Sequence, residues 1–220
     1  MYTLITRPDV ATAVSMCSRY LQQPREAHLQ AARRILRYLL LTSTKSLVYP
    51  KCLVTYLTCF VDSSWANDVD TRRSRYGYAV YVGRSLVSWC SKLHASVALS
   101  SAEAEYTAAT EAAKVMRWIR SLLVFLGCEV PKPARVFEDN SDCRTMVKSP
   151  QVSGRNKHFE LRQHYVREQV AKGFLQFKEV ATAEQVADIM TKPLARPCFE
   201  KHKESLLGGL PSKFCAGARD

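Results

Sequence analysis

The sequence predicts a mixed α/β domain preceded by two helices, and three observations carry this prediction. Over the first 45 residues apolar side chains recur every three or four positions, which is the spacing of helices. From residue 57 the apolar pattern alternates with a period of two, which is typical of strands. Beyond residue 100, helical and strand-like segments follow one another, and this order favours a sheet flanked by helices.

The first 45 residues are predicted to form a helical hairpin. Apolar residues at helical steps run from Val10 to Leu21 and, after Pro24, from Leu29 to Leu39. Proline cannot continue a helix, so it separates the two segments.

Three strands are predicted next. In residues 57–62, LTCFVD, a period of two puts Thr58, Phe60 and Asp62 on one face. Residues 76–91 are interpreted as two strands that turn at Gly83-Arg84. An antiparallel hairpin is therefore expected to follow the first strand.

A long helix is predicted after this hairpin. Ser100 and Glu103 have the spacing of an S-x-x-E capping box, in which each residue satisfies a free backbone N–H. A helical stripe of apolar side chains then runs from Tyr106 to Leu126, and Gly127 is suited to end the helix.

Shorter elements complete the pattern. Strands are predicted at 134–139 and 174–180, and helices at 156–171 and 182–190. Residues 196–220, which end in GGLPSKFCAGARD, are expected to form a loosely ordered tail.

The composition favours a polyanionic partner and argues against several classes of protein. The chain has 32 Lys and Arg against 20 Asp and Glu, a formal net charge of +12. No run approaches the ~18 apolar residues of a membrane span, and the opening residues lack a signal-peptide core. Eight cysteines without a CxxC pair argue against a zinc knuckle and a disulfide framework, so we expect them to be reduced and mostly buried.

The acidic residues collect in one stretch. Residues 101–150 carry 7 acids and 7 bases, whereas the rest of the chain is positive. This pattern is expected if the acids bind cations while the surrounding positive surface binds a phosphate backbone. It is equally expected if the acids form a solvated face of a helix. The candidate phosphate contacts are basic residues of the second helix and of the strand hairpin: Arg33, Arg34, Arg37, Arg72, Arg73, Arg75 and Lys92.

Four acids lie on different predicted elements. Asp62 ends the first strand, Glu105 is in the first turn of the long helix, Asp139 ends the fourth strand and Asp188 is on the last short helix. Each also has a purely structural explanation. Asp62 can start a turn, and Glu105 can interact with the dipole at the start of the helix. Asp139 can cap the following helix, and Asp188 can be a solvated helical acid. Converging carboxylates would repel one another unless hard cations were bound among them, which is how proteins build two-Mg²⁺ sites for phosphodiester displacement.

Longer blocks of sequence carry a specific resemblance. The blocks are FVDSSWAND (60–68), ALSSAEAEYTAATEAAKVMRW (98–118), FEDN (137–140), NKHFELRQHYVREQV (156–170) and QVADIMTKPL (185–194). They resemble the ribonuclease H domain of copia-type LTR retrotransposon Pol polyproteins. Residues 6–39 are similar to the segment that connects the reverse transcriptase to that domain, so the resemblance covers about residues 3–207.

This resemblance implies a ribonuclease H-like fold, with a five-stranded mixed sheet flanked by helices. It divides the chain into a helical connection segment at 1–50, a ribonuclease H-like domain at 51–195 and a C-terminal tail at 196–220. It also implies hydrolysis of the RNA strand of RNA/DNA hybrids, for which the alternative is a catalytically idle or domesticated nucleic-acid-binding module of the same fold.

Carried over residue by residue, the resemblance makes Asp62, Glu105, Asp139 and Asp188 the catalytic carboxylates that bind two Mg²⁺ ions, for which Mn²⁺ can substitute. Glu103 is the rival on the long helix. We prefer Glu105, because the family pattern places an acid just before the hydrophobic position and the capping box already explains Glu103.

The partners implied are an RNA/DNA hybrid and the polymerase domain of the parent polyprotein, without a membrane or a small-molecule cofactor. The chain has no YxDD-type polymerase motif and no His/Cys zinc pattern of an integrase. We expect a soluble protein inside the cell, in the cytoplasm and its retrotransposon particles, with the nucleus as the alternative.

Overall fold

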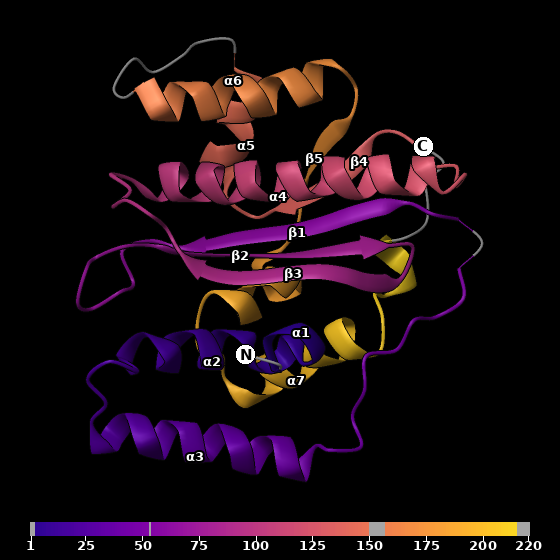
Figure 1. Cartoon of the computed structure of the whole chain (residues 1–220). Coiled ribbons are helices and arrows are strands. Elements are labelled where there is room, and N and C mark those ends of the chain that lie inside the picture. Colours follow the sequence, from indigo (N-terminus) through magenta and orange to yellow (C-terminus); the bar gives the residue numbers. More distant parts are fainter. Residues whose placement is uncertain (1–2, 53, 150–156, 215–220) are drawn as a thin grey trace.

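The computed structural model describes residues 3–52, 54–149 and 157–214 of the 220. A five-stranded sheet forms the middle layer, and helices cover both of its faces (Figure 1). The predicted fold class, a mixed sheet flanked by helices and preceded by a helical hairpin, is confirmed. No helix among the described residues is long and apolar enough to cross a membrane.

The strands lie in the order β3-β2-β1-β4-β5. β1 (Leu57–Ser64), β2 (Arg75–Val82) and β3 (Ser85–Leu93) form an antiparallel meander that turns at Gly83-Arg84, as predicted. β4 (Ala134–Glu138) pairs parallel to β1, and β5 (Leu175–Glu179) pairs parallel to β4. The carboxyl ends of β1 and β4 therefore meet at one edge of the sheet.

One face of the sheet is covered by α4 (Ser101–Phe125), α5 (Ser141–Lys148) and α6 (Lys157–Ala171). The Ser100 hydroxyl accepts from the Glu103 N–H at 3.1 Å, which confirms the predicted start of α4. Small buried alanines on the inner side of α4 allow a close approach to the sheet. They are Ala104, Ala108, Ala109, Ala112 and Ala113.

The N-terminal helices lie on the opposite face. α1 (Thr3–Thr6) is followed by a 3₁₀ turn at Pro8–Val10, by α2 (Ala11–Cys17) and by a second 3₁₀ turn at Ser18–Tyr20. α3 (Glu26–Leu41) then forms an outer layer beyond α2, and none of its residues, all of them described, is buried (Figure 1).

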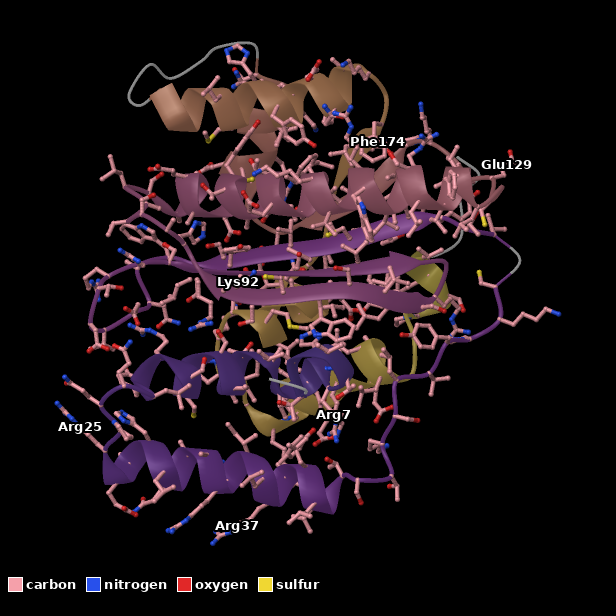
Figure 2. All side chains as sticks on the ribbon, viewed as in Figure 1. Arg7, Arg25, Arg37, Lys92, Glu129 and Phe174 are labelled. Atoms are coloured by element: carbon pink, nitrogen blue, oxygen red, sulfur yellow. The ribbon has the colours of Figure 1, made fainter. Side chains whose placement is uncertain are left out.

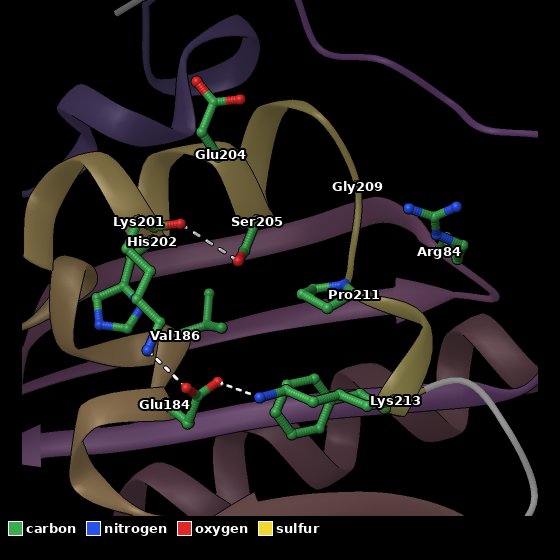
Figure 3. A pocket seen from close by; sticks show the side chains of 11 residues that line it. Arg84, Glu184, Val186, Lys201, His202, Glu204, Ser205, Gly209, Pro211 and Lys213 are labelled. Carbon is green, nitrogen blue, oxygen red and sulfur yellow. Dashed lines mark hydrogen bonds and ion pairs between the residues drawn. The ribbon is translucent and has the colours of Figure 1, made fainter.

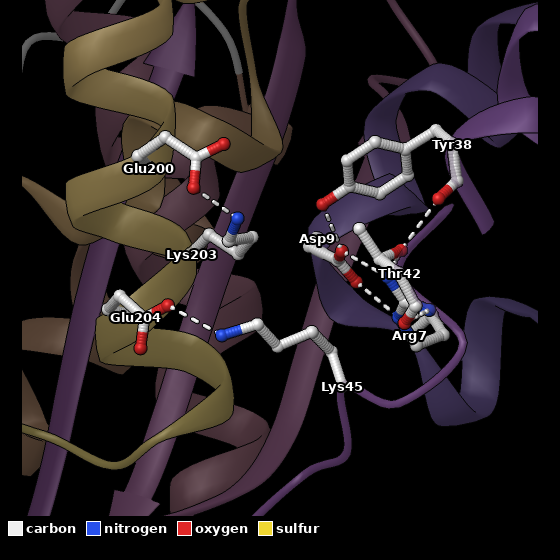
Figure 4. Close-up of polar contacts among 8 residues, drawn as sticks. All are labelled: Arg7, Asp9, Tyr38, Thr42, Lys45, Glu200, Lys203 and Glu204. Carbon is white, nitrogen blue, oxygen red and sulfur yellow. Dashed lines mark hydrogen bonds and ion pairs between the residues drawn. The ribbon is translucent and has the colours of Figure 1, made fainter. Parts of the chain in front are cut away.

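A polar network fixes the end of α3 to the start of the chain (Figure 4). The Arg7 guanidinium pairs with the buried carboxylate of Asp9 at 2.8 Å and donates to the hydroxyl of Thr42 at 2.7 Å. The Tyr38 hydroxyl also donates to Asp9, at 2.7 Å. Charge-assisted hydrogen bonds of this kind hold a helix whose apolar burial is small.

The expectation of a loosely ordered C-terminal tail is wrong for residues 196–214. Residues Arg196–Leu207 form α7, and a 3₁₀ turn follows at Ser212–Phe214. The Phe214 ring packs edge-on against Phe60 and Phe137, with centroids 5.1 Å apart in both pairs. The segment is ordered because it covers apolar side chains of the sheet that water would otherwise contact. Residues 215–220 lie outside the described residues.

The cysteine prediction is confirmed in part. All seven cysteines in the described ranges are free. Only Cys59, Cys90 and Cys143 are buried, so the expectation that most are buried is wrong for this set, and Cys215 lies outside the described residues.

Candidate active site

The four predicted acids come together at the edge where β1 and β4 end. Asp62 lies two residues before the end of β1 and Asp139 directly follows β4. Glu105 is just beyond the first turn of α4, rather than within it. Asp188 lies in a 3₁₀ turn, Val186–Met190, where the sequence predicted a short helix.

Asp62 is buried at the centre of this group. Its Oδ2 accepts from the Thr191 hydroxyl and lies 3.9 Å from the Lys192 ammonium. Burial raises the pKa of the Asp62 carboxyl, Lys192 and Thr191 oppose this, and the nearby charge of Asp139 adds to it.

Asp188 faces Asp62 across the same ammonium. The Lys192 Nζ lies 2.9 Å from Asp188 Oδ1. Burial, reinforced by the charge of Asp62, raises the pKa of Asp188 to about 7. For Lys192 burial acts to lower the pKa, but the charges of Asp62, Asp188 and Asp139 outweigh it and the net shift is upward.

Glu105 enters the group from α4. Its side chain is buried, and its Oε2 has no hydrogen-bond partner among the described residues. Burial first, and then the charges of Glu138 and Asp62, raise its pKa well above the usual range. A buried carboxylate oxygen without a donor is costly unless a proton or a cation satisfies it.

Glu103 has a different role. Its carboxylate accepts from the backbone N–H of Leu99 at 2.8 Å, while its own N–H bonds to Ser100. It caps α4, and this geometry favours Glu105 as the acid of the site.

Sequence reasoning missed a fifth acid. Glu138, the last residue of β4, is fully buried, and burial raises its pKa to about 8. Its Oε1 accepts from the Asn140 N–H at 3.0 Å, whereas its Oε2 has no partner in the described part of the chain. Asp139 is partly exposed and accepts from the Thr182 hydroxyl at 3.0 Å. The signal available was the pair of adjacent acids in FEDN.

The segment that carries Asp188 is held to the sheet by side-chain hydrogen bonds. The fully buried Gln185 amide donates to the Val61 carbonyl at 3.0 Å, beyond the point where β4 stops pairing with β1. From the other side, the Thr12 hydroxyl of α2 donates to the Ile189 carbonyl at 2.7 Å.

Gly77 makes room for this segment. It pairs with Asp62 in the β1–β2 ladder, and a Cβ atom there would lie 2.3 Å from the Cβ of Met190. Only a residue without a side chain lets the turn rest directly on β2.

Three of the predicted phosphate contacts near the strand hairpin are on the surface. Arg72 and Arg73 are exposed in the loop that leads from β1 to β2. Lys92 is exposed on β3 and pairs in register with Tyr76. This register puts it at the same edge of the sheet as Asp62, whose partner is the next residue of β2.

Arg75, the fourth residue of this group, is not on the surface as a phosphate contact would be. It is 4% exposed, and its guanidinium donates to the hydroxyls of Ser15 at 2.8 Å and Ser91 at 3.2 Å. It joins α2 to the sheet and presents no surface guanidinium, because the alternation of β2 turns it toward the N-terminal helices.

The arginines of α3 form a separate basic surface. Arg33, Arg34 and Arg37 are exposed on the outer layer, and Figure 2 shows Arg37 pointing away from the sheet. The structure therefore does not bring these three residues to the acids.

The donor set fits a hard divalent cation, since it consists of carboxylate oxygens and includes the unsatisfied Oε2 of Glu105. Within the described ranges, however, no three Asp, Glu, His or Cys side chains are already arranged to hold one ion. Lys192 lies between two of the acids instead.

A separate cavity of about 430 Å³ lies beside α7 (Figure 3). Three of its charged groups are paired with each other, since the Glu184 carboxylate binds Lys201 at 2.6 Å and Lys213 at 2.7 Å. None of the four predicted acids lines it.

The chain is similar to retrovirus-related Pol polyproteins from transposons. The chain is 39% identical over 199 residues to the retrovirus-related Pol polyprotein from transposon RE1 of Arabidopsis thaliana, covering 90% of this chain and 14% of that protein. It is 38% identical over 205 residues to the corresponding polyprotein from transposon TNT 1-94 of Nicotiana tabacum, covering 93% of this chain and 15% of that protein. The chain thus spans about one seventh of these relatives.

Among solved structures, the N-terminal RNase H domain of a Mycobacterium tuberculosis protein, fused to maltose-binding protein, is similar with a TM-score of 0.45 and 15% identity. The similarity covers 69% of this chain and 98% of that one. No protein-family model matches the chain.

Proposed function

The chain belongs to the family of retrovirus-related Pol polyproteins from copia-type transposons, and on this basis we propose that it is a ribonuclease H that hydrolyses the RNA strand of RNA/DNA hybrids. The observation that supports this best is the group of buried acids at the ends of β1 and β4, whose pKa values are raised first by burial and then by one another's charges. Such mutual repulsion is typical of a site that is completed by cations.

In this proposal Asp62, Glu105, Asp139 and Asp188 hold two Mg²⁺ or Mn²⁺ ions. Bound there, such ions would activate water and stabilise the leaving oxygen of the phosphodiester. The chain's own contribution is position: Thr191 orients the Asp62 carboxylate, and Gln185 fixes the turn that carries Asp188 to β1.

Strand choice would come from contacts to the 2′-hydroxyls, which only the RNA strand has. Arg72, Arg73 and Lys92 would bind phosphates next to the site. Because phosphate contacts carry little base information, we expect slight sequence preference.

We also propose that the chain is part of a longer polyprotein, in which it associates with a polymerase domain. Its parts are then a connection segment at 1–50, a ribonuclease H-like domain at 51–195 and a C-terminal tail at 196–220. This proposal places the protein inside the cell, in cytoplasmic retrotransposon particles. These three parts differ in their proposed origin, and the packing of α2 and α7 on one face of the sheet supports treating their described residues as a single folded unit.

A catalytically idle nucleic-acid-binding module of the same fold is the second candidate. One observation favours it, namely that Lys192 occupies the space between Asp62 and Asp188.

Cleavage of a labelled RNA/DNA hybrid in Mg²⁺ tests the two candidates, with single-stranded and duplex RNA as controls. We expect the wild-type protein to cut only the RNA of the hybrid. Asp62→Asn and Asp139→Asn should abolish cutting and leave hybrid affinity nearly unchanged, because each removes a ligand charge and little packing. Substantial Mg²⁺-dependent cutting by either variant contradicts the assignment, and binding without cutting by the wild type favours the idle module.

A further inference from the structure

The Lys192 ammonium lies against two carboxylates of the acid group. Its Nζ is 2.9 Å from Asp188 Oδ1 and 3.9 Å from Asp62 Oδ2. Both carboxylates are almost fully buried, with side chains 7% and 4% exposed, so they have few water molecules to balance their charge.

A divalent cation bound by both of these carboxylates would need the same space. Mg²⁺ binds carboxylate oxygens at about 2.0–2.1 Å, so an ion that bridges the two acids must lie between them. An ammonium group and a cation cannot occupy that volume together, and their like charges repel at such a distance.

The Lys192 side chain is able to move out of this position. It lies directly after the 3₁₀ turn and Thr191, and its side chain is 35% exposed, whereas the acids are buried. The four-carbon stem of lysine lets the ammonium swing toward solvent without moving the backbone.

We propose that Lys192 is a resident counter-ion that takes the place of a divalent cation between Asp62 and Asp188 and must leave before a cation bridges them. This inference rests on the proposed function only in treating the two carboxylates as cation ligands. Without metal, the lysine reduces the repulsion that would otherwise push the turn carrying Asp188 away from β1. With metal, it is displaced.

The proposal gives opposite expectations for stability and for metal binding. Removing the ammonium leaves the carboxylates unbalanced, so the metal-free protein should melt at a lower temperature. It also frees the site, so a cation should bind more tightly. A lysine that only stabilises the fold would change the first quantity and not the second.

The test measures Mn²⁺ binding to the full chain, without nucleic acid, from the electron paramagnetic resonance signal of free Mn²⁺. If the lysine occupies the site about nine-tenths of the time, Lys192→Met should lower the apparent Kd about tenfold, since apparent affinity scales with the fraction of competent sites. Lys172→Met, which removes an exposed ion pair with Glu168 on α6, is the matched control and should leave the Kd unchanged. Mg²⁺ competition against Mn²⁺ should follow the same order.

Equal or weaker Mn²⁺ binding by Lys192→Met than by the wild type overturns the proposal, as does binding too weak to measure in both proteins. If Lys192→Met does not fold without metal, Lys192→Gln is measured in its place, with the same criteria. Hybrid cleavage by the wild type is scored separately. Tighter Mn²⁺ binding by the variant together with no cleavage by the wild type would leave this inference standing and remove the proposed function.

Discussion

Glu103 and Glu105 are two positions apart on α4 and have different surroundings. The first satisfies a backbone N–H at the start of the helix, and the second is buried with an unsatisfied oxygen. We expect Glu105→Gln to lower hybrid cleavage about 10²–10³-fold, the order found when one electrostatic group of an active site is removed. Glu103→Gln should cost about 1 kcal/mol or less of stability and leave cleavage nearly unchanged.

Single-turnover cleavage at saturating Mg²⁺ and thermal melts of both variants measure these effects. The reverse ranking would make Glu103 the ligand and Glu105 a packing residue.

The raised pKa of Asp188 predicts how pH affects the metal-free protein. The pKa is about 7 in the folded chain, against an ordinary value of 3.8, so the folded state binds the proton more tightly. The stability from this group is complete below about pH 4 and is lost as the pH rises through 7. Glu138, with a pKa of about 8, extends the loss upward. We therefore expect the melting temperature in EDTA to fall between pH 4 and pH 8.

Asp188→Asn removes one of the acids whose pKa is raised and should make this fall shallower. Lys192 does not contribute in this range, because its pKa is raised from 10.5 and it stays charged throughout. A melting temperature that rises from pH 5 to pH 8 in EDTA would contradict the prediction.

At the scale of elements, α2 supports the turn that carries Asp188. The Thr12 hydroxyl is the donor to the buried Ile189 carbonyl, next to Asp188. Thr12→Val keeps the shape of the side chain and removes the donor, so it should cost about 1–3 kcal/mol for an unsatisfied buried carbonyl. Because the turn is then held less firmly, Mn²⁺ should also bind more weakly.

Denaturant unfolding and Mn²⁺ titration of this variant check both effects, and Thr12→Ser, which keeps the hydroxyl, is the control. A loss of stability with an unchanged Mn²⁺ affinity would mean that α2 stabilises the fold but does not position the acids.

For the whole molecule, the excess of positive charge predicts a steep dependence of hybrid binding on salt. Each neutralised phosphate releases counterions, and removing one contact lowers the slope of log K against log salt by about one. We expect Arg72→Gln with Arg73→Gln to lower the slope by about two, since both side chains are exposed at the edge that carries the acids.

Filter binding from low to high salt gives these slopes. Arg33→Gln with Arg37→Gln, on the outer layer, is the comparison and should change the slope less. Equal changes in the two double variants would place the hybrid on both basic surfaces.

The sequence predicted the elements whose signals are local. The start of α4 at Ser100, the turn at Gly83-Arg84 and the strand from Leu57 depend on neighbouring residues, and all three are confirmed. The capping box is only half formed, because the Glu103 carboxylate accepts from Leu99 rather than from Ser100.

The order of residues 196–214 was missed because it depends on distant partners, which no local pattern encodes. The Tyr81 hydroxyl of β2 donates to the Ser205 carbonyl of α7, and Phe214, beyond α7, packs on Phe60.

In the site, the acids could be chosen from their places on the predicted elements and from the resemblance. Lys192 could not, because its position between two acids depends on how the 3₁₀ turn folds back onto β1. The burial of Arg75 could not be predicted either, because the sequence does not tell which face of β2 the N-terminal helices cover.

The bonds that hold the Asp188 turn join parts of the chain that are far apart in sequence. Gln185 and Val61 are 124 positions apart, and Thr12 and Ile189 are 177 apart. During synthesis the ribosome releases α2 and β1 long before the turn exists, so these two elements wait with exposed polar groups until almost the whole chain has emerged. Closing such long loops is entropically slow, which makes assembly of the acid group one of the last steps of folding. A ribosome-bound chain that ends before residue 185 therefore lacks the contacts that complete the site.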